Sequence, residues 1–401
     1  MKLNKTIISK VSLISFISLV SFVSLVSSCS KSDDIDEQQN LPGVEIGGLS
    51  GYSTYFEEEM SKTRGGESLT RAWEKPTGYV DYEGGYQPIA IAFTKNGEDP
   101  TVGPDPGNPK SMIGFFFKVD GKWRTSVDIN ASTDYQLYGF IPHLPVIDYS
   151  ITDRSGGNTS YSDGAIMTLR NVPSVMPNDF CVVIGAKHGT DKEHDSGLRR
   201  GDFTFNSSQG AEGKDFVFLL FDHLYASLSI NMKVYDEYAE LRKIYLKSLK
   251  LSNLVDEDVT TDKTNITIDL KANDGSKSPI ESVTFTPTGD PVSGDGIEFW
   301  SNADGYPLTT AYQQFIGNFM PNGITKFVLT SEYDVYDRKG NLIRENCKAT
   351  NTMVLKDLLT EQETTQRGKR YTVNMTIWPT YVYVLSDPDL DNPTVKIVDR
   401  N

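Results

Sequence analysis

Cys29 is the residue whose position has the most specific chemistry, because it stands directly between a short apolar leader and a run of acids. Lys2, Lys5 and Lys10 make the start of the chain positive, and residues 11–26 form an apolar core that serines interrupt. This layout is typical of a secretory leader, and the stretch is too short and too rich in serine for a membrane span. We therefore expect the mature chain to leave the cytoplasm.

The end of the leader predicts covalent lipidation. Residues 26–29, Val-Ser-Ser-Cys, have the apolar–small–small–Cys form of a bacterial lipoprotein signal. A thiol is needed at the cleavage point because its sulfur carries the diacylglycerol that anchors the mature chain. We expect residues 1–28 to be removed by cleavage between Ser28 and Cys29, with the lipid on Cys29. The alternative is an ordinary signal peptide with an incidental cysteine at its boundary.

Acidic charge dominates the rest of the chain. The net charge is −15, and removing the three leader lysines from it makes −18. Such a surface repels phosphate backbones, which argues against nucleic acid as a partner. The acids begin in residues 30–37, a stretch that is too polar to pack a core. We interpret it either as a solvated tether or as a surface-export signal.

The histidines do not predict a catalytic or metal site. The chain has four of them, His143, His188, His194 and His223. His188 and His194 lie in a charged stretch, and their spacing matches no strong zinc motif. His223 has Asp222 beside it and Ser227 nearby, but all three fall in one expected strand segment without a nucleophile turn. We expect a packed structural histidine there.

Calcium and enzymatic chemistry are disfavoured as well. Residues 387–392 begin like a calcium loop, but Asn392 stands where the sixth-position glycine is needed, and Val398 where the twelfth-position glutamate is needed. Turn chemistry explains the segment better. With neither an acid–base pair nor a nucleophile motif in the sequence, we expect no enzyme, no metal and no cofactor.

The remaining composition indicates an all-β chain. Its 401 residues are 38% hydrophobic, and from residue 72 short Val-, Ile-, Phe-, Tyr- and Thr-rich runs alternate with turn residues. The expected strands are 88–94, 112–119, 135–141, 180–186, 216–221, 228–235, 244–251, 266–270 and 326–335. Cys181 and Cys347 lie too far apart for a disulfide framework, and Cys181 is expected to be a buried free thiol in an apolar run.

The strand spacing predicts two tandem β-sandwiches. A polar gap at residues 201–213 is the expected domain boundary. We therefore divide the chain into a signal peptide (1–28), an acidic tether with a removable first strand (29–71) and two sandwiches (72–212 and 213–401). Residues 216–235 are an open alternative, because they can instead close the first domain.

Several segments resemble the fimbrillins, the surface lipoproteins that build type V pili in Bacteroidetes. Residues 216–228, Phe-Val-Phe-Leu-Leu-Phe-Asp-His-Leu-Tyr-Ala-Ser-Leu, resemble that family's strand ending in phenylalanine and histidine before small and apolar residues. Residues 243–253 are similar to the strand that follows it, and segments 70–72, 138–142 and 368–373 stand where the family has corresponding ones. Together with the leader and the length, the resemblance covers nearly the whole chain.

This resemblance implies sandwiches of the transthyretin-like type and a role in pilus assembly and adhesion. In the family, a surface Arg-specific protease removes the first strand with its lipid, and a strand from another subunit's tail fills the open groove. The implied partners are other pilus subunits, that protease, the membrane through the lipid (with palmitate), and a host or bacterial receptor or glycan. The implied location is the surface of the cell outer membrane and, after maturation, the pilus.

The sequence contains candidates for the strand that is removed and the strand that replaces it. Residues 43–47, Gly-Val-Glu-Ile-Gly, form a short alternating run bounded by glycines. The tail has the same alternation at residues 394–398, which places Val395 and Ile397 on one face. Residues 381–385, Tyr-Val-Tyr-Val-Leu, are the candidate extension of this donor segment.

Two arginines are candidates for proteolytic maturation. Arg64 and Arg71 lie in residues 61–72, a polar stretch that we interpret as an exposed linker. Arg71, followed by Ala72, fits the family's Thr-Arg-Ala pattern better. The alternative is that both are plain solvated arginines and that the chain stays tethered as an anchor or tip component.

A surface glycan-binding lipoprotein is the competing function. Tyrosine and tryptophan in residues 299–306, interpreted as a loop, would stack on sugar rings.

Overall fold

The structure is a computed structural model, and it describes fifteen separate parts of the chain. They are residues 44–51, 56–59, 88–101, 112–119, 122–125, 127, 129, 133–189, 198–206, 215–255, 258–259, 261–292, 295–321, 323–354 and 364–377. Strands dominate these parts, which confirms the predicted all-β fold. Among the described residues, no helix is long and apolar enough to span a membrane.

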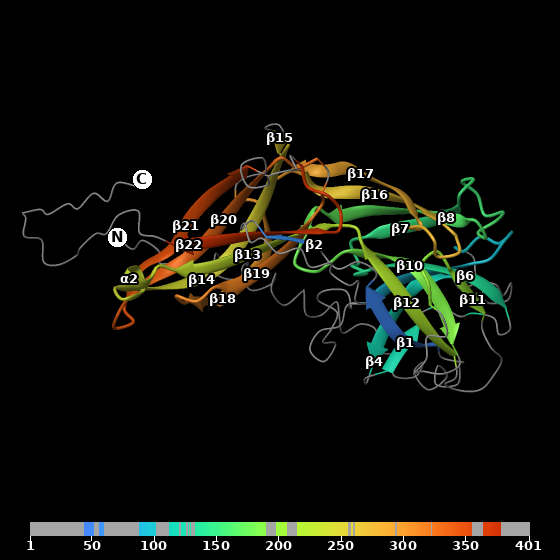
Figure 1. Ribbon diagram of the computed structural model, residues 1–401, viewed down its shortest axis with the longest axis horizontal. Coiled ribbons are helices and arrows are strands. Elements are labelled where there is room, and N and C mark those ends of the chain that lie inside the picture. The colour runs from blue at the N-terminus through green and yellow to red at the C-terminus, as the bar shows by residue number, and fades with distance from the viewer. Residues whose placement is uncertain are drawn as a thin grey trace, which may run out of the picture.

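The largest sheet, here the barrel sheet, holds eight strands and curls so that its two end strands come into contact (Figure 1). Its order is β1 (Val44–Gly51), β12 (Asp215–His223), β10 (Cys181–Gly189), β6 (Asp134–Ile141), β3 (Ile89–Thr94), β4 (Ile113–Val119) and β5 (Lys122–Thr125), with β11 (Thr204–Asn206) pairing β6. The end strands β1 and β5 thus meet across the concave side.

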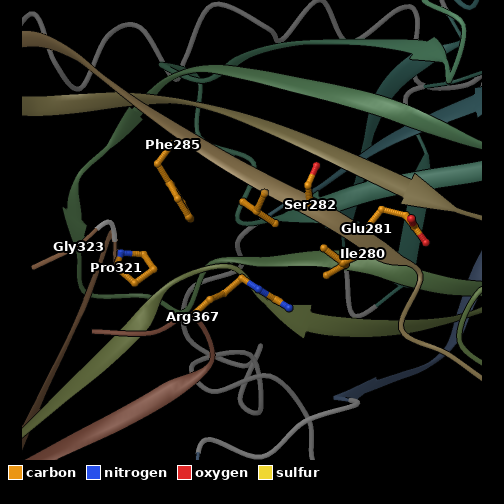
Figure 2. A pocket seen from close by; sticks show the side chains of 8 residues that line it. Ile280, Glu281, Ser282, Phe285, Pro321, Gly323 and Arg367 are labelled. Carbon is orange, nitrogen blue, oxygen red and sulfur yellow. The ribbon is translucent and has the colours of Figure 1, made fainter. Parts of the chain in front are cut away.

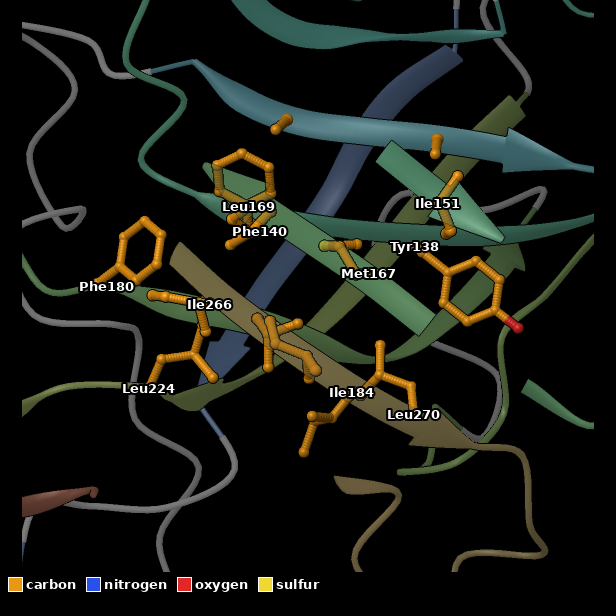
Figure 3. Close-up of a cluster of buried hydrophobic side chains, with 14 of the residues drawn as sticks. Tyr138, Phe140, Ile151, Met167, Leu169, Phe180, Ile184, Leu224, Ile266 and Leu270 are labelled. Atoms are coloured by element: carbon orange, nitrogen blue, oxygen red, sulfur yellow. The ribbon is translucent and has the colours of Figure 1, made fainter. Parts of the chain in front are cut away.

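A second sheet, the cover sheet, packs on the other face of the barrel sheet. Its order is β17 (Ile280–Pro291), β16 (Thr261–Lys271), β8 (Gly164–Pro173) and β7 (Asp148–Asp153). On β16, Ile266, Ile268 and Leu270 are fully buried at every second position, as expected of a strand with one face on a core. Figure 3 shows Ile266 and Leu270 in one cluster with Tyr138 and Phe140 of the barrel sheet. The two sheets form the first lobe.

The second lobe is a sandwich of two further sheets. One holds β2 (Phe56–Glu59), β22 (Lys369–Ile377), β13 (Ala226–Val234), β19 (Gln313–Phe319) and β9 (Val175–Met176) in that order. The other holds β15 (Asp258–Val259), β14 (Arg242–Val255), β20 (Lys326–Asp337) and β21 (Leu342–Val354), with β18 (Ile297–Leu308) on β14. Their shared core includes Ile230, Leu249 and Phe327. A single helical turn, α2 (Asp236–Ala239), joins β13 to β14.

The sheets do not divide at residue 213, where the sequence places the domain boundary. β12 belongs to the barrel sheet, and the β16–β17 hairpin pairs with β8 of the first lobe. The polar gap at 201–213 instead contains β11 and comes just before β12, and both strands belong to the barrel sheet. Its composition is that of a long surface loop, which local sequence does not distinguish from a linker between domains.

The loop that joins β7 to β8 is organised by the buried carboxylate of Asp153. Its Oδ1 accepts hydrogen bonds from the Ser155 hydroxyl at 2.6 Å and the Gly157 N–H at 3.0 Å, and its Oδ2 accepts from the N–H groups of Thr159 at 2.6 Å and Ser160 at 2.9 Å. These bonds, led by that from the Ser155 hydroxyl, hold the pKa of Asp153 well below its usual range.

We expect Asp153 to make the fold sensitive to acid. A carboxyl whose pKa is depressed by folding stabilises the protein above the unfolded pKa of about 3.9, and this contribution is lost as the pH falls below it. Asp153→Asn should therefore lower the melting temperature at pH 7 and reduce its further fall between pH 5 and pH 2. Thermal melts over this range test this, with Asp148→Asn, a largely exposed aspartate, as the control. Parallel wild-type and Asp153→Asn curves would contradict the assignment.

Candidate functional site

The candidate site is the edge of the barrel sheet at which β1 lies. β1 pairs with β12 in parallel and aligns Ile46 with Val217 and Leu49 with Leu219. A register shift between Ile46 and Gly48 interrupts the simple alternation that the sequence indicates. β1 is an end strand of the sheet and comes before both candidate cleavage arginines in the chain. The predicted strand near residues 43–47 is therefore present, within the sheet.

Beside β1 lies a second hydrophobic core, on the concave side of the barrel sheet. Val217, Leu219 and Phe221 of β12 belong to it and are at most 1% exposed, whereas Leu220 belongs to the core under the cover sheet. β3 alternates in the same way, with Ile91 in the concave core. Since β1 lies between β12 and β5, the concave core depends on β1 for closure along that side.

The same stretch of chain contributes an edge strand to the second lobe. β2 pairs in parallel with β22, aligning Phe56 with Lys369 and Glu59 with Thr372. Sequence reasoning missed this strand, because consecutive glutamates are poor strand formers and nothing local indicates the pairing. Residues 44–59 thus supply an end strand to a sheet in each lobe.

Most of the sequence-predicted site residues lie outside the described parts. They are Ser28, Cys29, Arg64, Arg71, Ala72, Val395 and Ile397, together with the extension at 381–385 and the discounted calcium segment at 387–392.

Comparison with solved structures finds several proteins of Bacteroides. The chain is similar to candidate adhesion and fimbrial proteins. A candidate cell adhesion protein of Bacteroides uniformis is 13% identical, with a TM-score of 0.32 over 84% of this chain and 94% of that chain. A candidate cell adhesion protein of Bacteroides fragilis is 9% identical, with a TM-score of 0.34 over the same shares. A fimbrial protein of Bacteroides vulgatus is 12% identical, with a TM-score of 0.29 over 72% of this chain and 88% of that one.

No protein-family model matches the chain, and no curated protein matches it. At the identities and TM-scores above, the likeness assigns neither a family nor a function. The pairing of the strands defines the fold.

A buried polar cluster lies where the two lobes meet. The Asp179 Oδ2 is 2.8 Å from the His223 Nδ1, and the Cys181 Sγ is 3.5 Å from the same nitrogen. Because both partners approach one ring nitrogen, the arrangement is not the relay of a nucleophilic triad, in which they take opposite nitrogens. Burial, and after it the Asp179 charge, raises the pKa of the Cys181 thiol, the opposite of nucleophile activation.

This cluster was missed in the sequence, although His223 was correctly expected to be structural and Cys181 a buried free thiol. The antiparallel register of β10 and β12 places Cys181 directly opposite His223, which sequence spacing does not reveal. The ligand atoms of Asp179, Cys181 and His223 lie within 4.8 Å of one another, a grouping of residue types that could hold a metal ion.

Arg367 connects the cluster to the second lobe. It lies just before β22, and its guanidinium donates to the His223 carbonyl oxygen at 2.6 Å and to the Asp222 Oδ2 at 3.2 Å. The next residue, Gly368, donates its N–H to the Tyr225 carbonyl at 3.0 Å from a left-handed backbone with φ of 70°. The start of β22 is thus held against the β12–β13 connection.

Arg367 also lines a hollow of about 360 Å³ at this junction (Figure 2). Ile280 and Phe285 of β17 and the turn at Pro321 form its apolar walls, with Glu281 at its edge. The lining mixes apolar and charged groups contributed by both lobes. The hollow therefore belongs to the joint between the lobes.

Two other histidines pack against aromatic rings. His143 stacks on Phe115 with ring centroids 5.1 Å apart, and burial lowers its pKa. His188 meets the Phe205 ring edge-on at 5.2 Å. His194, its expected neighbour in a charged loop, lies outside the described residues.

The aromatic segment behind the glycan-binding alternative is a strand. Residues 299–306 fall within β18, whereas the sequence indicated a loop. The Trp300 ring packs edge-on against Phe315 at 4.8 Å and Tyr306 against the same ring at 5.8 Å. Turn residues such as Asp304-Gly305 gave the appearance of a loop, but Gly305, with φ of 79°, is accommodated inside the strand. These rings pack against one another, and Tyr306 also keeps 37% of its surface exposed.

Proposed function

We propose that this chain is a fimbrillin-like structural and adhesive subunit of a cell-surface pilus that assembles by β-strand exchange. The observation that carries the proposal is the place of β1. It is an end strand of the barrel sheet, it closes one side of a hydrophobic core, and it precedes both candidate cleavage arginines. Removal of this strand leaves the other strands of the barrel sheet and the cover sheet in one continuous chain.

Maturation in this scheme begins with the lipid on Cys29 at the surface of the outer membrane. An Arg-specific surface protease then cuts after Arg71 or, alternatively, after Arg64. Because β1 and β2 both lie before residue 64, a cut at either arginine detaches both strands. One cleavage thereby leaves one sheet in each lobe without an end strand.

The free energy for assembly comes from the surface that this cut uncovers. Val217, Leu219 and Phe221 are almost completely buried beside β1. Burying a side chain of this size stabilises by about 1.5–3 kcal/mol, so recovering three of them is worth roughly 5–9 kcal/mol as an upper value. The unpaired edge of β12 adds backbone hydrogen bonds to an incoming strand.

The carboxy-terminal tail of another subunit is the proposed donor. Residues 394–398 repeat the alternation of the lost strand with Val395 and Ile397, and residues 381–385 lengthen the donor segment. The other partners are the protease and a surface receptor or glycan. The descriptions of the compared adhesion and fimbrial proteins name the same class of function. The proposal itself rests on the strand geometry.

Gel analysis of surface fractions tests the proposed function. Polymers held by inserted strands should give high-mass ladders in unboiled samples that collapse to one subunit on boiling, with fibres visible by electron microscopy. A single subunit band in both samples, together with retention on polysaccharide columns, would replace the proposal by the glycan-binding alternative.

A further inference from the structure

The large exposed hydrophobic side chains of the described residues are concentrated at one end of the molecule. They are Val146, Leu241, Tyr306, Tyr312, Leu342 and Ile343, all between 37% and 51% exposed. Val146 lies in the first lobe. The other five lie at the end of the second lobe that faces away from the first, here called the distal end, where α2 is seen in Figure 1.

Strand register places these five residues, which come from four segments, at the same end of the second lobe. Arg242, which follows Leu241, pairs with Asp337, and Leu342 pairs with Tyr336 across the same β20 end. Tyr306 pairs with Leu246 near the start of β14. These pairings connect residues that are as much as a hundred positions apart in the sequence.

The β18–β19 turn completes the group. The Val234 N–H donates to the Thr309 carbonyl at 2.8 Å, and the Lys233 Nζ lies 4.9 Å from the centre of the Tyr312 ring. The Arg338 guanidinium donates to the Glu240 carbonyl, which ties the β20–β21 turn to the end of α2. The apolar side chains therefore stand among charged neighbours, as in a protein interface with a polar rim.

β22, the last described strand, ends at this same end of the second lobe. The Tyr235 N–H donates to the carbonyl of Ile377, the last residue of β22, at 3.1 Å. Only residues 378–380 separate Ile377 from the apolar segment 381–385. Four residue steps span at most about 14 Å, so a donor segment that includes the extension 381–385 reaches only a surface pressed closely against the distal end.

We infer that the distal end, with Leu241, Tyr306, Tyr312, Leu342 and Ile343, is the docking surface for a second copy of this chain. The inference rests on the proposed function. In addition, the acceptor subunit, which receives the tail, covers the distal end of the donor subunit. It does so with the edge of its first lobe around β12 and β5. Apolar contact between the second lobe of the donor and the first lobe of the acceptor then adds to the binding by the inserted strand. This contact also sets the angle between successive subunits.

The test compares polymerisation of chains that begin at Ala72, using light scattering and electron microscopy. The docking variant is Leu342→Glu with Ile343→Glu, and Tyr312→Glu is a second, independent variant. Val146→Glu is the matched control, because it charges an equally exposed apolar residue in the other lobe. A fourth chain lacks residues 378–401, and thermal melts accompany every variant.

The docking variants should melt like the unaltered chain and polymerise roughly tenfold or more slowly, since interface anchors near a buried centre carry most of the binding energy. Val146→Glu should polymerise normally. Normal polymerisation of both docking variants, with the tail-deleted chain monomeric, would overturn the docking surface and leave strand exchange intact. Polymers from the tail-deleted chain would instead overturn strand exchange by the tail.

Discussion

A chain carrying Arg64→Ala and Arg71→Ala is expected to remain a lipidated monomer that forms no fibres on cells. The change leaves β1 and β2 attached, so the edge of β12 stays paired and the concave core stays closed. An incoming strand then has to displace one that is tethered to the same molecule and therefore has a high effective concentration. The expected result is the complete loss of high-mass ladders.

Single variants then identify the cleaved bond. Arg71→Ala alone should suffice if maturation follows Arg71, and amino-terminal sequencing of wild-type fibres should begin at Ala72. Arg170→Ala, which removes a partly exposed arginine in β8, is the matched control and should leave fibres unchanged. Wild-type fibres whose subunits begin at Cys29 would show that assembly proceeds without removal of β1.

The second large effect is expected from the tail. Deleting residues 394–401 should give a folded chain that is cleaved normally but does not polymerise. The point variants Val395→Asp and Ile397→Asp should act in the same direction, because each places a charge where the acceptor groove is apolar, at a cost of several kcal/mol. Fibre length and number by electron microscopy, with thermal melts to check folding, provide the measurement.

Lys396 supplies the internal control for this experiment. Alternation along the tail places it on the face opposite Val395 and Ile397. Lys396→Ser should therefore polymerise like the unaltered chain. Fibres of normal length from the chain lacking residues 394–401 would rule out this segment as the donor and leave 381–385 as the candidate.

Local sequence was sufficient to predict most of the strands. The expected strands at 135–141 and 326–335 correspond to β6 and β20, because period-two alternation and turn residues act over a few positions. The turn between β20 and β21 is equally local, with Gly340 at φ of 85° and the Asp337 carboxylate accepting the Asn341 N–H. These features depend on neighbours in the chain.

The pairing of distant strands was not predictable in the same way. β1 pairs with β12, and the aligned residues Val44 and Asp215 are 171 positions apart in the chain. Only the complete sheet determines that β12 is the partner of β1. The β16–β17 hairpin likewise joins the first lobe through pairing with the distant strand β8, which local sequence does not indicate. β2 has no signal of its own, because its glutamates resemble a solvated surface until β22 is beside them.

The candidate site was therefore only partly predictable. A removable first strand was indicated by the glycines around residues 43–47, whereas the concave core that it closes became evident only with the curled barrel sheet. Likewise, Cys181, His223 and Asp179 are unremarkable in the sequence and meet through the register of β10 and β12.

Cross-linking of mixed fibres determines whether another subunit's tail occupies the place of β1. Fibres are assembled from equal amounts of isotope-labelled and unlabelled chains and treated with a lysine-specific cross-linker. We expect links from Lys396 to Lys187 of β10 and to Lys214, the residue before β12, and these links should join labelled to unlabelled chains. Intact fibres in which Lys396 forms links only within its own chain, or only to the second lobe of its neighbour, would contradict it.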